Sequence, residues 1–278
     1  MMKFETYQNL KLILIIAVIF AASIPFYYCF LFFVPQLFGC QPKVIYVAIV
    51  YALADVAYIP LIIYLSRKKE IQISRKVNLP GIQLVMLLVL LAISGLIILL
   101  PFYNPVDYFT HLVDRRLKVA VFDISQLQLR WGISFFGFAL ISPVIEEILW
   151  RKQIQGLLMR NLSPFWSIVL TSVLFACWHL RISNIIALFA WSLLFGVVYY
   201  KTKSMVASMI LHSFNNILIL LFKHTYVYGT PLYLVEYVTV IAVSVLVIYL
   251  IIKNIERYTV VKTQISDENA SLPLDNGA

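Results

Sequence analysis

LISPVIEEILWRK, residues 140–152, places two glutamates and an arginine inside an otherwise apolar run. Glu147 and Arg151 are four residues apart, so a helix would put both side chains on one face and favour an ion pair. Glu146 would then point about 100° away from that face. A charged group at membrane depth costs about 2.5–3.5 kcal/mol on insertion scales, so this cluster predicts a functional site. The alternative is a buried ion network with a purely structural role.

The residues around this stretch indicate a membrane protein. The chain has 278 residues, of which 62% are hydrophobic and 13% charged, whereas about 25% charged residues are typical of soluble domains. Apolar runs of about 20 residues, long enough to cross about 30 Å of hydrocarbon, recur along most of its length. We therefore predict an all-α, polytopic bundle of about eight transmembrane helices, with spans near 12–34, 44–65, 82–101, 131–159, 163–180, 185–200, 204–222 and 231–252.

The two ends of the chain are expected to differ. The first apolar run continues through Phe33, which is too long for the core of a signal peptide and predicts a transmembrane helix. Residues 1–253 are expected to form the membrane-embedded bundle, with a catalytic core at about 130–220. The polar tail at 254–278 has too little apolar surface to fold alone, and we expect it to be disordered and cytoplasmic.

Charge distribution predicts the orientation and excludes one class of partner. The net charge is +9, and five basic residues cluster in the loop at 67–76. The positive-inside rule makes that loop cytoplasmic, so eight spans would place both termini inside and the 102–130 loop outside. Basic charge in this setting predicts contact with anionic lipids of the bilayer rather than with nucleic acid.

Two further pairs at the same spacing lie in later apolar runs. Phe175 and His179 belong to SVLFACWHL, and His212 and Asn216 belong to HSFNN. The chain has four histidines, and the other two fall in predicted loops. Counted along the predicted spans, His179 lies nearer the outer face than His212. Ahead of the glutamates, a serine and a proline at 142–143 predict a fresh helix start with the serine as N-cap.

These residue types suffice for peptide-bond hydrolysis without a covalent nucleophile. A glutamate and a histidine together can activate a water molecule, and histidine with asparagine can donate hydrogen bonds to a developing oxyanion. Cys177 cannot pair with His179, because two residues correspond to opposite sides of a helix. Zinc held by Glu146, His179 and His212 is a minor alternative, since no His-Glu-x-x-His motif is present. We therefore predict that no metal and no cofactor is required.

The stretches EEILWR (146–151), FACWH (175–179) and HSFNN (212–216) resemble three motifs of the CPBP family. These membrane endopeptidases, also called the Abi family, comprise the CAAX prenyl proteases and bacteriocin-processing enzymes. Their motifs are Glu-Glu-x-x-x-Arg, Phe-x-x-x-His and His-x-x-x-Asn, and they occur here in the same order. Lys152 stands where family members commonly have a glycine.

The resemblance implies both a fold and a set of roles. The helical bundle would enclose an active-site cavity within the membrane. Glu146 and His179 would activate the water, while His212 and Asn216 would stabilise the oxyanion. The supporting ion pair would be the glutamate and arginine already noted at 147 and 151. The sequence assigns neither substrate-binding residues nor an oligomeric state.

The predicted function is that of a glutamic-type intramembrane endopeptidase in the cell membrane. Its substrate would be a membrane-associated peptide or protein, such as a CAAX-type tail, a peptide pheromone precursor or a bacteriocin leader. The enzyme could alternatively serve bacteriocin self-immunity. The alternative is a non-catalytic membrane scaffold that regulates a partner protein. A transporter fits less well, because the polar residues crowd into one half of the chain and no repeat is visible.

Overall fold

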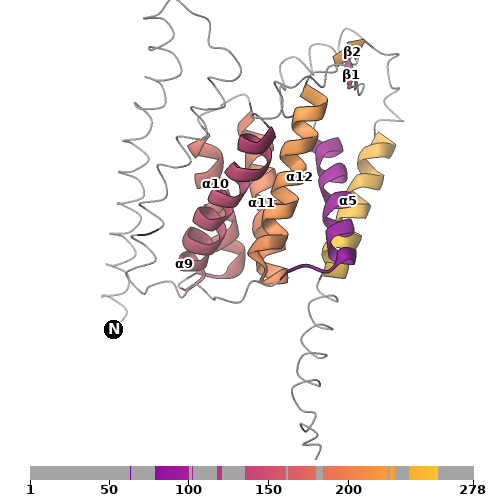
Figure 1. The fold of residues 1–278 in the computed structure, drawn as a ribbon. Coiled ribbons are helices and arrows are strands. Elements are labelled where there is room, and N and C mark those ends of the chain that lie inside the picture. The colour runs from indigo at the N-terminus through magenta and orange to yellow at the C-terminus, as the bar shows by residue number, and fades with distance from the viewer. Residues whose placement is uncertain are drawn as a thin grey trace, which may run out of the picture.

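The computed structural model describes residues 63, 79–99, 102, 118–120, 135–160, 162–179, 184–223, 226–228 and 238–255. This part of the chain is helical apart from one short sheet (Figure 1). Each of the six predicted spans from residue 82 onward coincides with helix here. The spans predicted near 12–34 and 44–65 (residue 63 apart) and the tail after residue 255 lie outside the described residues.

Three helices of the described part are long and apolar enough to cross a membrane: α5 (Ile82–Leu99), α11 (Ile185–Thr202) and a helix at Val238–Ile255. All have 18 residues, which gives a length of about 27 Å at 1.5 Å per residue. The helical prediction is therefore confirmed for this part of the chain, which holds three candidate membrane spans. The total of about eight spans stays a prediction.

The run that carries the glutamates is one continuous helix with changing pitch. It consists of the π-helix η4 (Phe135–Ile141), α8 (Ser142–Glu147), the π-helix η5 (Ile148–Gln155) and α9 (Gly156–Leu158). Wide π turns of this kind often occur at functional sites. The run stays helical through Pro143, although proline cannot donate a backbone hydrogen bond.

The predicted serine N-cap at this point is wrong. Residue Ile141, which precedes α8, has ordinary helical angles of φ −72° and ψ −49°, and no side chain caps the helix there. Ser142 instead lies inside the continuous helix, and its hydroxyl donates a hydrogen bond to Glu146 Oε1 at 2.8 Å. Because the preceding π turns keep the chain helical, no free N-terminus is formed for the serine to cap.

Two further helices complete the described bundle: α10 (Pro164–Trp178) and α12 (Met205–Lys223). α10 begins at a proline, which suits the first helical position because its missing N–H would have no partner there. Between α11 and α12 the chain turns at Lys203, which has φ 50°. Ser204 Oγ then accepts a hydrogen bond from the N–H of Ala207 at 3.2 Å, which caps the start of α12.

A two-stranded antiparallel sheet joins β1 (Lys118–Ala120) to β2 (Tyr226–Tyr228), with Lys118 opposite Tyr228. The sequence did not predict these strands. Their pairing brings the connection after α5 and the connection after α12 to one end of the bundle (Figure 1). Both connections lie on the outer side in the predicted topology, and the pairing agrees with that arrangement.

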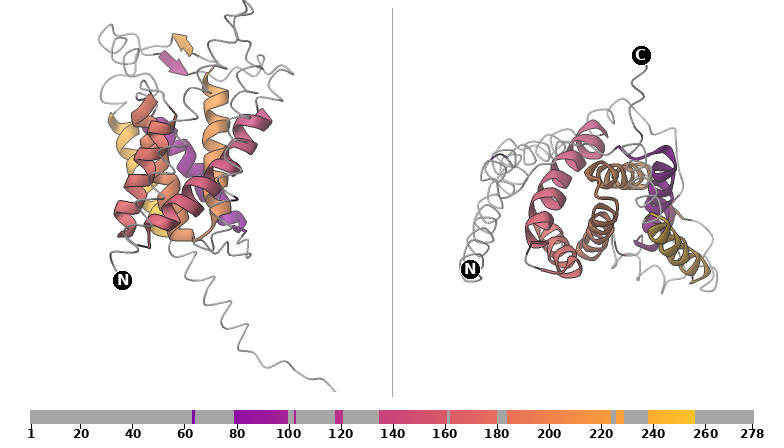
Figure 2. Two further views of the ribbon diagram at one scale, coloured as in Figure 1. Left: turned by 90° about the vertical axis from the view of Figure 1, so that its left-hand side faces the viewer. Right: turned by 90° about the horizontal axis from the view of Figure 1, so that it is seen from below.

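Two hydrophobic clusters flank the middle of the bundle. One joins α5, α11, α12 and the helix at Val238–Ile255, and the other packs η5 against α10. In the view from below, the run from η4 to α10 curves around α11 and α12, while α5 and the Val238–Ile255 helix lie on the far side (Figure 2). Buried polar side chains come from η5, α8, α11 and α12.

Candidate active site

Glu147 and Arg151 form a completely buried ion pair, with Arg151 Nε 3.1 Å from Glu147 Oε2. Arg151 Nη2 also donates a hydrogen bond to Ser192 Oγ on α11 at 2.8 Å. The guanidinium carbon lies 5.4 Å from the ring centroid of Phe175 and 5.8 Å from that of Phe195. Ion pairing, hydrogen bonding and cation–π contacts offset part of the cost of burying this cation, whose Nη1 has no hydrogen-bond partner among the described residues.

The Glu147 carboxylate accepts hydrogen bonds from three side chains. Besides Arg151, the donors are the hydroxyl of Ser208 and His212 Nδ1, the latter at 3.0 Å from Glu147 Oε1. Ser208 and His212 lie one turn apart on α12. The sequence predicted only the arginine contact and missed both bonds from α12. A signal was present, because a serine four residues before the motif histidine shares its helix face.

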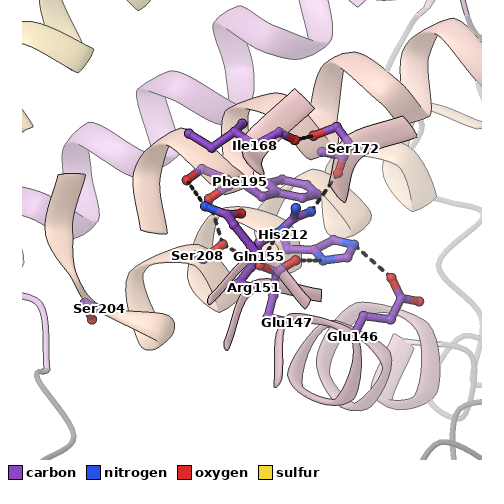
Figure 3. Close-up of polar contacts among 12 residues, drawn as sticks. Glu146, Glu147, Arg151, Gln155, Ile168, Ser172, Phe195, Ser204, Ser208 and His212 are labelled. Carbon is purple, nitrogen blue, oxygen red and sulfur yellow. Dashed lines mark hydrogen bonds and ion pairs between the residues drawn. The ribbon is translucent and has the colours of Figure 1, made fainter. Parts of the chain in front are cut away.

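His212 lies between the two glutamates (Figure 3). A carboxylate without a proton only accepts hydrogen bonds, so the contact with Glu147 puts a proton on His212 Nδ1. The other ring nitrogen, Nε2, is 3.9 Å from Glu146 Oε2. The site therefore presents Nε2 toward the second carboxylate, and both groups are nearly buried.

Glu146 differs from Glu147 in its partners. Its side chain is oriented toward His212 and away from the arginine, as helical spacing predicts (Figure 3). Ser142 donates to its Oε1 atom, whereas Oε2 has no hydrogen-bond partner among the described residues. Only 8% of the residue is exposed. One oxygen of this nearly buried carboxylate therefore retains its capacity to accept a proton or a hydrogen bond.

His179 follows the last residue of α10 and is partly buried. Its Nδ1 lies 2.8 Å from the carbonyl oxygen of Phe175, so Nδ1 is the donor and Nε2 is the basic nitrogen of the neutral ring. The Phe175 ring contacts both histidines, at 4.5 Å from the His179 ring and 6.0 Å from the His212 ring. The Phe175 ring therefore connects the two histidines.

Asn216 lies one turn beyond His212 on α12 and is buried. Its Nδ2 donates to the carbonyl oxygen of Phe138 in η4 at 2.8 Å, and its Oδ1 accepts from Asn215 at 3.2 Å. The widened turns of η4 leave a carbonyl that this amide reaches. Since an amide nitrogen carries two hydrogens, a second one remains for another acceptor.

The structure thus brings together five of the six predicted residues. Glu146, Glu147, Arg151 and His212 are linked by direct contacts, and Asn216 lies one turn from His212 on α12. His179 joins this group through the Phe175 ring. In the part of the chain that the structure describes, no three His, Cys, Asp or Glu side chains are grouped as a metal site requires. A reaction without a cofactor remains a prediction.

Fold and site together define a class, that of helical membrane proteins with a buried glutamate–histidine centre. Residues 128–218 match the family model of the type II CAAX prenyl endopeptidase Rce1-like proteins. The resemblance to the CPBP family is confirmed over this segment, which includes every predicted site residue. Because that family consists of proteases, the match supports a hydrolase. Neither the curated proteins nor the solved structures gave a significant match.

Proposed function

We propose that this protein is a multi-pass intramembrane endopeptidase of the cell membrane that cleaves a membrane-associated peptide. A C-terminal tail carrying a prenylated cysteine is the first candidate substrate, because residues 128–218 match a CAAX-type family. Peptide pheromone and bacteriocin precursors are the other candidates. The contact that carries the proposal is His212 between two buried glutamates, 3.0 Å from Glu147 and 3.9 Å from Glu146.

Glu146 is the proposed general base. A water molecule would donate a hydrogen bond to its Oε2 atom, which has no hydrogen-bond partner among the described side chains and lies 3.9 Å from His212 Nε2. The water oxygen attacks the carbonyl carbon of the scissile bond while its proton passes to the carboxylate. His179, whose Nδ1 is held by a backbone carbonyl, would accept the second hydrogen of that water at Nε2. The role of this pair follows from the family resemblance.

His212 and Asn216 are the proposed oxyanion donors. A protonated imidazole at position 212 would donate from Nε2 to the developing oxyanion, and the carboxylate of Glu147 would stabilise its positive charge through Nδ1. The free hydrogen of the Asn216 amide is a second donor. Collapse of the tetrahedral intermediate then breaks the C–N bond. The proton on Glu146 passes to the departing amine, which restores the Glu146 carboxylate, and the acyl product leaves as a carboxylic acid that gives its remaining proton to solvent.

The test uses the full chain in lipid vesicles with a fluorogenic peptide that ends in a prenylated cysteine and three further residues. The same peptide without the prenyl group is the substrate control, and Glu146→Gln is the enzyme control. Cleavage by the wild type alone, with one new peptide terminus, is the expected result. If the prenylated peptide is intact, peptides from the membranes of cells carrying either form are compared for other substrates.

A scaffold would give a different outcome. Cells with wild type or Glu146→Gln at matched expression would then contain the same peptides, and any phenotype of the wild type would survive the substitution. That result would overturn the proposed protease, because a carboxamide cannot accept the proton of the attacking water.

A further inference from the structure

Phe195 lies at the centre of the site but belongs to none of its three motifs. It is completely buried on α11. Its ring is stacked on that of His212, with centroids 4.4 Å apart and planes at 21° (Figure 3). Its backbone carbonyl accepts a hydrogen bond from Ser208 at 3.1 Å. Phe195 therefore contacts both the proposed oxyanion donor and a hydroxyl that binds Glu147.

Stacking supplies a constraint on His212 that its hydrogen bond lacks. The bond to Glu147 holds Nδ1 but permits the ring to rock about that contact. A flat aromatic surface on one side fixes the plane of the ring, so the direction of Nε2 is set as well.

A second aromatic residue supports Phe195 from behind. Trp191 lies one turn earlier on α11, and its ring stacks on Phe195 at 5.8 Å and 25°. The tip of this indole lies against Gly95 of α5, where a Cβ atom would be only 2.7 Å from Trp191 Cη2. The series from Gly95 through Trp191 and Phe195 to His212 thus connects α5, outside the family-matched segment, with the site.

Ordinary core packing explains part of this arrangement but not its geometry. Phe175 also contacts Phe195 and His212, yet it meets both edge-on, at 84° and 68°. The two contacts in the series, by contrast, are nearly parallel. A parallel neighbouring ring restricts tilting of the imidazole out of its plane, whereas edge-on contacts alone leave that tilting less constrained.

We infer that Phe195, supported by Trp191 and α5, is a positioning residue that orients the His212 ring for catalysis. The inference rests on the proposed function only for the catalytic role of His212. The orientation itself is a property of the folded protein and is measurable without a substrate.

The first measurement is made by NMR on the full chain in lipid bilayers with isotope-labelled histidine. The chain has only four histidines, and loss of signals in His212→Gln assigns the ring of interest. We expect one narrow set of His212 ring signals in the wild type, and doubled or exchange-broadened signals in Phe195→Leu. Leu88→Ala, a change in the same hydrophobic cluster, is the control and should leave the His212 signals narrow.

The second measurement is kinetic and uses the prenylated fluorogenic peptide. In Phe195→Leu, kcat should fall about a hundredfold while KM changes less than about twofold, since a misplaced donor weakens the transition state more than substrate binding. Trp191→Leu should show a smaller loss in the same direction, and Trp191→Phe should restore most of it. This pair of tryptophan variants decides the question if Phe195→Leu does not fold.

Narrow His212 signals in Phe195→Leu, or a kcat equal to that of Leu88→Ala, would overturn the positioning role. If the wild type cleaves no peptide, the proposed protease fails, while the NMR comparison still decides whether Phe195 orients the ring.

Discussion

The helix at Val238–Ile255 and the run at 135–158 differ in almost every respect, although both belong to the same bundle. In the former only 17% of the residues are buried, and most of its large apolar side chains are exposed. The latter contains fully buried Glu147 and Arg151 and nearly buried Glu146. It is not among the helices that are long and apolar enough to count as candidate spans.

The difference shows how a membrane bundle accommodates polar chemistry. Lipid gives little hydrophobic reason for helices to associate, so packing and interhelical hydrogen bonds hold the bundle together. In a helix that faces lipid, stability therefore depends mainly on apolar composition. In a helix that carries charged residues, it depends on the specific side chains that pair with those charges. Substitutions in the two regions should consequently have effects of very different size.

The largest effect is expected at the proposed base. Glu146→Gln should lower the cleavage rate about 10³-fold, within the range of general base catalysis, because the amide keeps the shape but cannot take the proton. His179→Ala and His212→Ala should act in the same direction. Rates with the prenylated peptide test this, and thermal unfolding should change little for Glu146→Gln. Equal rates for wild type and Glu146→Gln would refute the assignment.

A large loss of stability is expected at the buried ion pair. Arg151→Met should lower the free energy of unfolding by about 3–5 kcal/mol, because the buried Glu147 carboxylate loses its permanently charged partner and keeps only Ser208 and His212 as hydrogen-bond donors. The double variant Glu147→Leu with Arg151→Met should recover only part of this loss, because it removes the buried charge but leaves Ser208 and His212 without their acceptor. Unfolding titrations in mixed micelles provide the measurement. Lys152→Met, next in the chain but partly exposed, is the matched control and should change stability by about 0.5 kcal/mol or less.

A moderate effect is expected at the contact between α5 and α11. Gly95→Ala should destabilise the protein by about 1–3 kcal/mol, as overpacking usually does, because the new Cβ would be 2.7 Å from the Trp191 ring. Gly137→Ala is the control, since no described atom lies within 4 Å of its Cβ position. Equal unfolding midpoints for the two alanine variants would show that Trp191 is not packed in this way.

The smallest effect is expected on the helix that faces lipid. Leu246 is 55% exposed, so Leu246→Ala should change the free energy of unfolding by about 0.5 kcal/mol or less. The same titrations measure it. A loss of 2 kcal/mol or more would mean that this face packs against protein, and the contrast between the two regions would then need revision.

Much of the described fold followed from apolar runs, because a span across lipid needs about 20 apolar residues and a helix satisfies its own backbone. The π-helical turns on either side of α8 could not be predicted from the sequence. A proline predicts a disrupted helix, but it does not show whether the neighbouring turns stay helical. The sheet between β1 and β2 was also missed. Its strands have three residues each and lie more than 100 residues apart in sequence, so no local pattern indicates the pairing.

Within one helix, the sequence by itself determined the geometry of the site. Spacing of four residues brought Glu147 to Arg151 and turned Glu146 away, because helical periodicity sets those directions. Between helices, only the tertiary structure decided the partners: His212 between two glutamates, Asn216 on the Phe138 carbonyl, and Phe195 stacked on the imidazole. Such contacts depend on the rotation and depth at which packed helices meet, and local spacing contains no information about either.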